Sequence, residues 1–293
     1  MEEGFKLWAN PSSPHGEGRK ARAALEDARA RIKAALGWTG ELIFTSGASE
    51  AAALALGRAK GGRRFVSAVE HDCVLQAAPD ADLLPVLADG QLDLAALVEA
   101  IGSDRPVVAV QQVNSETGYR QALGLIHERV SQAGGLLIAD CAQGAGKLAI
   151  PDCDMAMIAA HKFGGPIGIG ALLVRDFAML EPSGGHERGY RRGTENLPGA
   201  LGMAAALEAC SESYLDADVL RAFDAFDSEC RSAGGTLLSD RLSDPTPYIR
   251  AIAMPNLSAT AQVMRFDMAG IAVSQGSACS RGTMKTSPVL DAM

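Results

Sequence analysis

The 293-residue sequence lacks several features that define specialised classes of protein. No apolar run reaches the ~18 residues of a membrane-spanning helix, so we expect no membrane contact. No cysteine pair has the C-x-x-C spacing, and the five histidines match no zinc-site pattern, which predicts that no metal is bound. Positive charge is also scarce, because the net charge is −8, and this argues against a nucleic-acid-binding surface.

The composition is that of a soluble globular protein, with 47% hydrophobic and 21% charged residues and no signal-peptide pattern at the N-terminus. The length allows one large or two ordinary domains. Five of the six cysteines lie in apolar or helical stretches, where a buried free thiol is the usual state. They are Cys73, Cys141, Cys153, Cys210 and Cys230, whereas Cys279 lies in a Gly/Ser-rich loop. A reducing, cytoplasmic location is expected.

Strand-like and helix-like segments alternate over the first two thirds of the chain. Short apolar runs predict strands at 42–45, 64–69, 106–113, 136–140, 155–158 and 169–174. Helical spacing predicts helices near 25–36, 46–57, 92–101 and 123–133. In the third of these helices Leu94, Leu97, Val98 and Ile101 form one apolar face. This alternation is typical of an α/β domain with a mainly parallel sheet flanked by helices.

The pattern changes after Pro198. Two helices (198–212 and 217–232) are followed by short strands at 236–238 and 249–254 and a helix at 259–269. We therefore expect an N-terminal segment (1–15), a large domain (16–210) and a small α+β C-terminal domain (211–293).

A lysine and an aspartate carry the strongest chemical signal. Lys162 lies between a small apolar run and the Gly-rich turn at 164–168, and at the end of a buried strand its amine would be desolvated and nucleophilic. Asp140 closes the apolar strand at 136–139, where a carboxylate is costly to bury without a partner. Its partner would be either the protonated nitrogen of a bound pyridine ring or a basic side chain in a salt bridge. Gln143 lies three residues further on, close enough in sequence to reach a phenolic oxygen of the same pyridine ring.

Other polar motifs each allow two interpretations. The turn at 46–49 is either a phosphate site at a helix N-terminus or a plain helix cap. His71 follows a strand and either contacts a cofactor ring or is structural. Asn114 lies after the strand at 106–113, in a ligand site or a turn. The loop at 184–196 is either a surface loop or a source of cations and a hydroxyl for a phosphate.

Lysine, acidic partner and the thiol of Cys279 together suggest pyridoxal 5'-phosphate (PLP) chemistry with a sulfur step. In this order the motifs resemble those of the cysteine desulfurases, within the class V aminotransferase family. The resemblance runs from Asn10 to Met293. It implies PLP fold type I, a small C-terminal domain carrying the catalytic cysteine loop, and a homodimer with active sites at the interface.

The resemblance also implies roles for individual residues. Lys162 holds PLP as an aldimine and then moves the α-proton of the substrate, Asp140 pairs with the ring nitrogen, and Cys279 accepts the sulfur. The remaining residues that it assigns to the site are Gln143 at the ring oxygen, His71 stacked on the ring, Asn114 at the substrate carboxylate, and Ala48, Ser49, His161 and the partner subunit's Thr194 around the phosphate.

The implied reaction converts L-cysteine to L-alanine and leaves a persulfide on Cys279. About fourteen residues separate Cys279 from the end of the chain, a spacing similar to that of the branch that donates sulfur to iron–sulfur cluster assembly proteins. The alternatives are a selenocysteine lyase or another class V transaminase, and a non-catalytic desulfurase-like partner protein.

The sequence departs from the family pattern at several places. The family's opening strand has no counterpart before Met1, and its last stretch, with the Arg that grips the substrate carboxylate, has none after Met293. The small domain is therefore expected to be incomplete. Ala159 stands where a phosphate-binding Ser is usual, and Ser49 replaces a Thr. Fewer phosphate hydroxyls predict weaker PLP retention, by ~1 kcal/mol per lost hydrogen bond.

Overall fold

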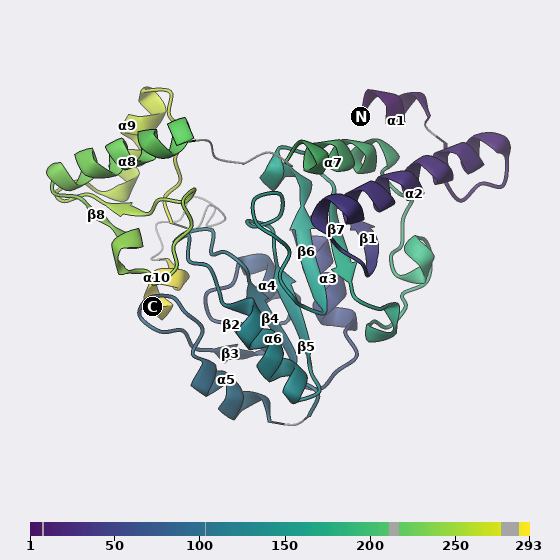
Figure 1. Ribbon diagram of the computed structural model, residues 1–293, viewed down its shortest axis with the longest axis horizontal. Coiled ribbons are helices and arrows are strands. Elements are labelled where there is room, and N and C mark those ends of the chain that lie inside the picture. Colours follow the sequence, from purple (N-terminus) through teal and green to yellow (C-terminus); the bar gives the residue numbers. More distant parts are fainter. Residues whose placement is uncertain (8, 103, 211–216, 277–286) are drawn as a thin grey trace.

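A seven-stranded sheet forms the centre of the computed structural model, which describes residues 1–7, 9–102, 104–210, 217–276 and 287–293 (Figure 1). Across the sheet the strands are β1 (Glu41–Thr45), β7 (Gly170–Val174), β6 (Met155–Ala159), β5 (Leu136–Asp140), β4 (Val107–Gln111), β2 (Arg64–Ser67) and β3 (Asp82–Leu84). The pairings from β6 to β3 are all parallel, whereas β7 runs antiparallel to both β6 and β1. The prediction of a mainly parallel α/β sheet is confirmed.

Helices cover both faces of this sheet, so its central strands are mainly apolar. Every residue of β4, β6 and β7 is buried, as expected for strands with two covered faces. One face packs against α2 (Gly16–Leu36), α5 (Leu94–Ile101), α6 (Leu123–Gln132) and α7 (Leu197–Ala209). The other packs against α3 (Ala48–Arg58) and α4 (Asp72–Ala77). The short helix α1 (Glu2–Lys6) contacts α7.

Two helices test the predicted boundaries and faces. Helix α2 ends where Gly37 adopts a left-handed conformation with φ of 64°, which a glycine adopts without steric cost. In α5 the expected apolar face is only partly correct, because Leu97 and Ile101 are buried but Val98 is 52% exposed. The helix contacts the core through a stripe too narrow to include Val98. No helix in the described ranges is long and apolar enough to cross a membrane.

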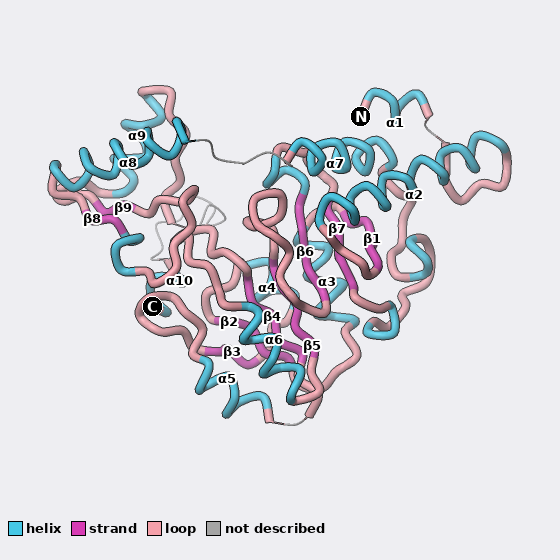
Figure 2. The backbone as a smooth tube through the Cα atoms, in the orientation of Figure 1, coloured by secondary structure: helices cyan, strands magenta, loops and turns pink. Residues whose placement is uncertain are grey.

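The C-terminal part of the chain lies to one side of the large sheet (Figures 1 and 2). It contains α8 (Ala217–Ser232), β8 (Thr236–Leu237), β9 (Ile252–Ala253), α9 (Ala259–Met268) and α10 (Pro288–Ala292). Strand β9 is shorter than the predicted 249–254, because β8 offers only two residues to pair with. The domain boundary at residue 211 stays a prediction.

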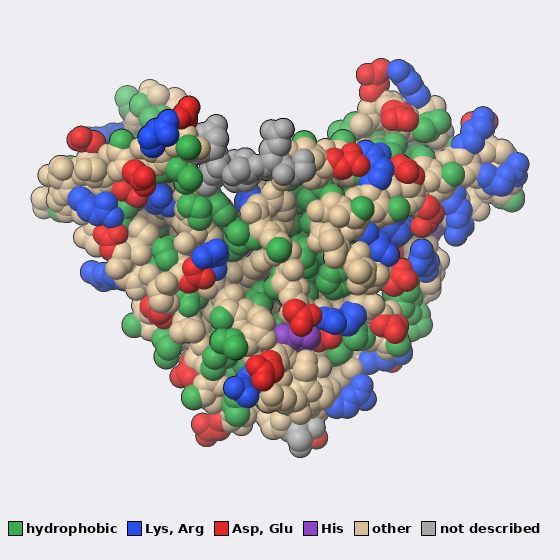
Figure 3. All heavy atoms as spheres, in the orientation of Figure 1, with side chains coloured by type: hydrophobic (Ala, Val, Ile, Leu, Met, Phe, Trp, Pro, Cys, Tyr) green, Lys and Arg blue, Asp and Glu red, His purple; other side chains and the backbone are tan. Residues whose placement is uncertain are grey.

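One loop of this part joins it to the large sheet. The amide of Thr246 donates to the carbonyl of Gly118 at 2.8 Å, and the Tyr248 hydroxyl donates to the Gln143 carbonyl at 3.2 Å. Arg120 forms an ion pair with Asp244. The face of the molecule in Figure 3 carries interspersed acidic and basic side chains with apolar ones between them.

Candidate active site

The chemically important residues follow neighbouring strands at one edge of the sheet. Asp140 is the last residue of β5, and Lys162 lies in the 3-10 turn Ala160–Phe163 directly after β6. His71 follows β2, and Asn114 follows β4. Because parallel strands end at the same edge, the fold brings these four segments together where α/β proteins bind ligands.

Asp140 is the buried anion of this edge. The residue is 7% exposed, and its Oδ1 accepts a hydrogen bond from the Ala142 amide at 2.9 Å. Burial raises the pKa of Asp140, whereas the Ala142 amide and the neighbouring His71 and Lys162 lower it. His71 and Lys162 are therefore close enough to act on Asp140.

His71 is held by the helix that it caps. Its Nδ1 accepts a hydrogen bond from the Cys73 amide at 3.2 Å and lies 3.0 Å from the Cys73 Sγ. Because Nδ1 accepts an N–H, the proton of the neutral imidazole is on Nε2. The start of α4 thus sets both the orientation and the tautomer of His71.

Lys162 differs from the prediction of a desolvated amine. The turn Ala160–Phe163 buries Ala160 and Phe163, and it leaves both His161 and Lys162 exposed. The reason is the period of three residues, which places Ala160 and Phe163 on the same side of the turn and leaves the two residues between them on the other. Partial burial and the neighbouring charge of Lys162 lower the pKa of His161.

The start of α3 fits the predicted phosphate site. Ala48 and Ser49 occupy its first turn, and among the described residues no side chain caps it. The amides of a first turn favour an anion. The Ser46 amide instead donates to Glu50 at 2.5 Å, and Arg191 forms an ion pair with Glu50 at 2.9 Å. This pair ties the loop at 184–196 to the predicted phosphate site.

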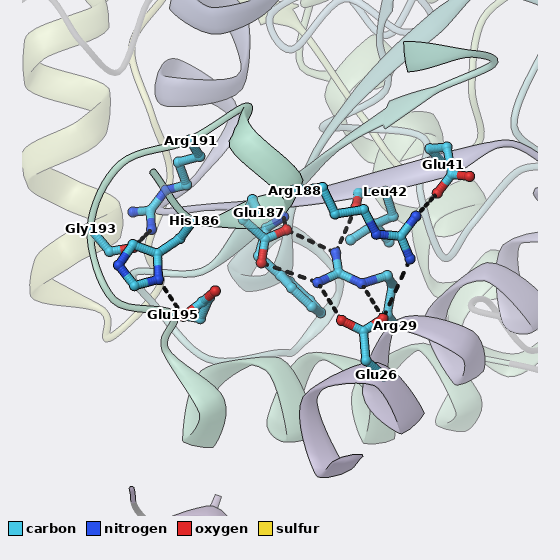
Figure 4. Close-up of polar contacts among 11 residues, drawn as sticks. Glu26, Arg29, Glu41, Leu42, His186, Glu187, Arg188, Arg191, Gly193 and Glu195 are labelled. Carbon is cyan, nitrogen blue, oxygen red and sulfur yellow. Dashed lines mark hydrogen bonds and ion pairs between the residues drawn. The ribbon is translucent and has the colours of Figure 1, made fainter. Parts of the chain in front are cut away.

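A buried ion pair anchors the same loop from its other side (Figure 4). Glu187 accepts from Arg29 through both oxygens, at 2.8 and 3.1 Å, and from the Phe44 amide at 2.8 Å. Arg29 also donates to the Leu42 carbonyl at 2.6 Å. The pair therefore satisfies backbone groups on the outer edge of β1, where no other described strand pairs. Thr194, the loop's predicted phosphate ligand, is exposed.

The side chain of Asn114 already has three partners within the chain. Its Nδ2 donates to the Val69 carbonyl at 3.0 Å, and its Oδ1 accepts from the amides of Glu116 and Thr117, each at 2.9 Å. One N–H of the carboxamide remains for a substrate. The Gln143 carbonyl accepts from Lys147 at 3.3 Å and from Tyr248, which fixes the backbone next to Asp140.

Three buried charged residues of this region escaped the sequence analysis: Arg29, Glu70 and Glu187. For two of them the sequence contained a signal, because Glu70 directly precedes His71 and Glu187 lies within the loop at 184–196. Their partners lie far away in sequence, so the pairing itself could not be predicted. Cys279 lies outside the described residues, so its predicted role stays a prediction.

PLP is the group that these residues suit. Within the described chain Asp140 accepts one hydrogen bond, which leaves acceptor capacity for a protonated ring nitrogen. The charge of Lys162 acts on this carboxylate, and the first turn of α3 offers amides to a phosphate. An amine for covalent attachment, a counter-ion for the ring and an anion site are the groups a PLP enzyme supplies.

Comparisons with known proteins agree with this chemistry. The family model Aminotransferase class-V matches residues 2–291. The chain is 35% identical to a cysteine desulfurase of Cereibacter sphaeroides, over 98% of this chain and 80% of that protein. It is 32% identical to cysteine desulfurase IscS 1 of Archaeoglobus fulgidus, over 97% of this chain and 80% of that protein.

A solved structure gives the same result at the level of the fold. The NifS-like protein of Rickettsia africae superposes with a TM-score of 0.87 at 28% identity, covering 100% of this chain and 85% of that one. The chain therefore belongs to the class-V aminotransferase family and, within it, to the cysteine desulfurases.

Proposed function

We propose that this chain is a PLP-dependent cysteine desulfurase, which converts L-cysteine to L-alanine and transfers the sulfur to an acceptor. The observation that carries this function is the convergence of Asp140, His71 and Lys162 at the carboxyl ends of β5, β2 and β6. Membership of the cysteine desulfurase family gives the substrate.

The residues divide the work according to their chemistry. PLP, when bound, supplies an electron sink for the charge that develops at the substrate α-carbon. Asp140 keeps the ring nitrogen protonated through its negative charge. Lys162 would hold the cofactor covalently through Nζ, and the same amine would carry the proton at the substrate α-carbon.

The other side chains bind and orient. We assign the imidazole of His71 to the cofactor ring, with its proton on Nε2, and Gln143 to the ring oxygen. The remaining N–H of Asn114 is assigned to the substrate carboxylate. The first turn of α3, with Ala48 and Ser49, and the exposed His161 are assigned to the phosphate.

Cys279 is proposed as the sulfur acceptor within the chain. Its thiolate attacks the substrate sulfur, the substrate carbon–sulfur bond breaks, and the β-carbon takes up a proton to give alanine. The sulfur stays on Cys279 as a persulfide, so that one cysteine yields one alanine and one persulfide. No oxidant is needed.

The cysteine variants test this assignment. We expect Cys279→Ser to retain PLP but to lose alanine release by more than ~10³-fold, because no nucleophile then reaches the substrate sulfur. Cys141→Ser should stay near the parent rate, since Cys141 is fully buried and burial raises its pKa well above the usual range. Mass spectrometry after turnover should find the additional sulfur on Cys279. Extra sulfur on Cys73 or Cys141 instead would contradict the assignment.

The same proposal includes a homodimer, in which Thr194 of each chain reaches the phosphate site of the other. Two observations support this dimer: the loop at 184–196 is anchored, and Lys162 is exposed where a partner subunit would cover it.

We propose an iron–sulfur cluster assembly protein as the sulfur acceptor, because the spacing after Cys279 resembles that of the desulfurases that donate sulfur to such proteins. A cytoplasmic location is part of the same proposal.

Shared active sites have a direct test. Lys162→Ala and Thr194→Arg are each expected to be inactive, the second because a bulky cation displaces the phosphate contact. If the sites are shared, refolding the two variants together creates dimers with one intact site. We expect measurable alanine release from the mixture. If each chain works alone, the mixture will release no more alanine than the separate variants do.

A further inference from the structure

Two buried glutamates each take the place of a missing strand. Glu187 accepts the Phe44 amide on the free edge of β1. Glu70 does the same for β4: β2 ends at Ser67, and beyond that point the Gln111 amide donates to Glu70 Oε1 at 2.7 Å. Both residues are equally buried, each 4% exposed.

Their electrostatic surroundings are opposite. Both oxygens of Glu187 accept hydrogen bonds, and the guanidinium of Arg29 balances its charge. Glu70 Oε2 is buried, and no described residue provides it with a hydrogen-bond partner. Among the described residues the charge that acts on Glu70 is that of Asp140, at the end of β5, which is also an acid. Burial and the charge of Asp140 raise the pKa of Glu70 well above its usual range, against the opposing effect of the Gln111 amide.

Two adjacent buried acids cannot both ionise cheaply, so one of them keeps its proton. The Ala142 amide and the positive charge of Lys162 stabilise the anion of Asp140. Glu70 has only the Gln111 amide. The arrangement therefore places the negative charge on Asp140 and the proton on Glu70.

We propose that Glu70 is a positioning residue that acts as a neutral acid, fastening the turn that carries His71 to β4 and leaving the negative charge on Asp140. The part of this inference that concerns the cofactor ring rests on the proposed function. The hydrogen bonds around the turn support it. The Val69 carbonyl accepts from Gln111 Nε2 at 2.6 Å and from Asn114 Nδ2 at 3.0 Å, while Glu70 holds the Gln111 amide. His71 is the next residue.

The stability of Glu70→Gln tests the protonation state, with Glu187→Gln as the matched control. A neutral Glu70 keeps a proton that the unfolded chain releases above its ordinary pKa. The stability of the parent should therefore fall as the pH rises from about 4.5 towards the raised folded pKa, by up to tenfold in the unfolding equilibrium constant per pH unit. Glutamine cannot release a proton, so the stability of Glu70→Gln relative to that of the parent should increase as the pH rises from 5 to 8.

Urea unfolding of the purified protein at several pH values measures this difference. We expect Glu70→Gln to be at least as stable as the parent at pH 8, whereas Glu187→Gln is less stable at every pH. A loss for Glu70→Gln that matches that of Glu187→Gln and does not decrease with pH would overturn the proposal, because it would mean that Glu70 is ionised. This comparison involves neither cofactor nor turnover.

A spectroscopic readout tests the positioning role. We expect Glu70→Gln to retain the visible absorption band of bound PLP with a titration midpoint within ~0.3 pH unit of the parent, and Glu70→Ala to retain less PLP. If Glu70 were an anion, its removal would lower the midpoint by about a unit, which would overturn the proposal. A parent that binds no PLP would refute the proposed function, whereas the unfolding data would still decide the protonation state of Glu70.

Discussion

Lys162→Ala is expected to abolish the covalent attachment of PLP and to slow alanine release from L-cysteine by at least ~10³-fold. In the proposed assignment the variant loses both the amine that holds the cofactor and the base that moves the α-proton, and general acid–base catalysis alone contributes ~10²–10⁴-fold. Borohydride reduction followed by peptide mapping measures the attachment, and amino-acid analysis measures the alanine.

Lys147 provides the control for this prediction. Burial and the charge of Lys162 lower its pKa, although Cys210 opposes them, so it is the most plausible competing amine nearby. It instead donates to the Gln143 carbonyl at 3.3 Å and lies 5.2 Å from the centre of the Tyr248 ring. Lys147→Ala should keep the covalent adduct. An adduct that maps to Lys147 in the parent would contradict the assignment of Lys162.

Glu187→Ala is expected to lower the free energy of unfolding by about 3–5 kcal/mol, the range for breaking a buried ion pair from one side. Arg29 would keep its charge in a site where its side chain is 6% exposed, and the Phe44 amide would lose its acceptor. Urea denaturation measures the change. Because the pair anchors the loop that carries Thr194, PLP retention should fall as well.

A second Arg–Glu pair on the same helix is the matched control. Arg31 binds Glu208 through two hydrogen bonds of 2.7 and 2.6 Å, but both side chains are substantially exposed. Exposed pairs contribute little, because water and salt screen them. Glu208→Ala should therefore change stability only slightly. Equal losses for Glu187→Ala and Glu208→Ala would show that burial does not determine the strength of the Arg29 pair.

Local signals explain why much of the fold could be predicted. Apolar runs bounded by Gly and Pro mark the strands, and Gly37 marks the end of α2 because a left-handed residue is needed there. The same runs place Asp140 at the end of β5, so the charged end of a buried strand was visible in the sequence. The short elements α4 and β3 escaped prediction, since neither has a full period of apolar residues.

Contacts between distant residues explain what the sequence left open. Glu70 and Gln111 are 41 residues apart, and Glu187 and Phe44 are 143 apart. The sequence contains both glutamates, but nothing in it shows that Arg29 faces one and Asp140 the other. The exposure of Lys162 also depends on tertiary structure, since the turn after β6 points the side chain away from the core.

The measurement that tests the central claim most directly is the product of turnover. Purified protein supplied with PLP and L-cysteine is predicted to release alanine and to carry a persulfide on Cys279. The same experiment with L-selenocysteine separates the desulfurase from a selenocysteine lyase. If alanine is released from selenocysteine but not from cysteine, the assignment of L-cysteine as the substrate is wrong. A protein that shows no PLP absorption band and releases no alanine from either amino acid would contradict the proposed function as a whole.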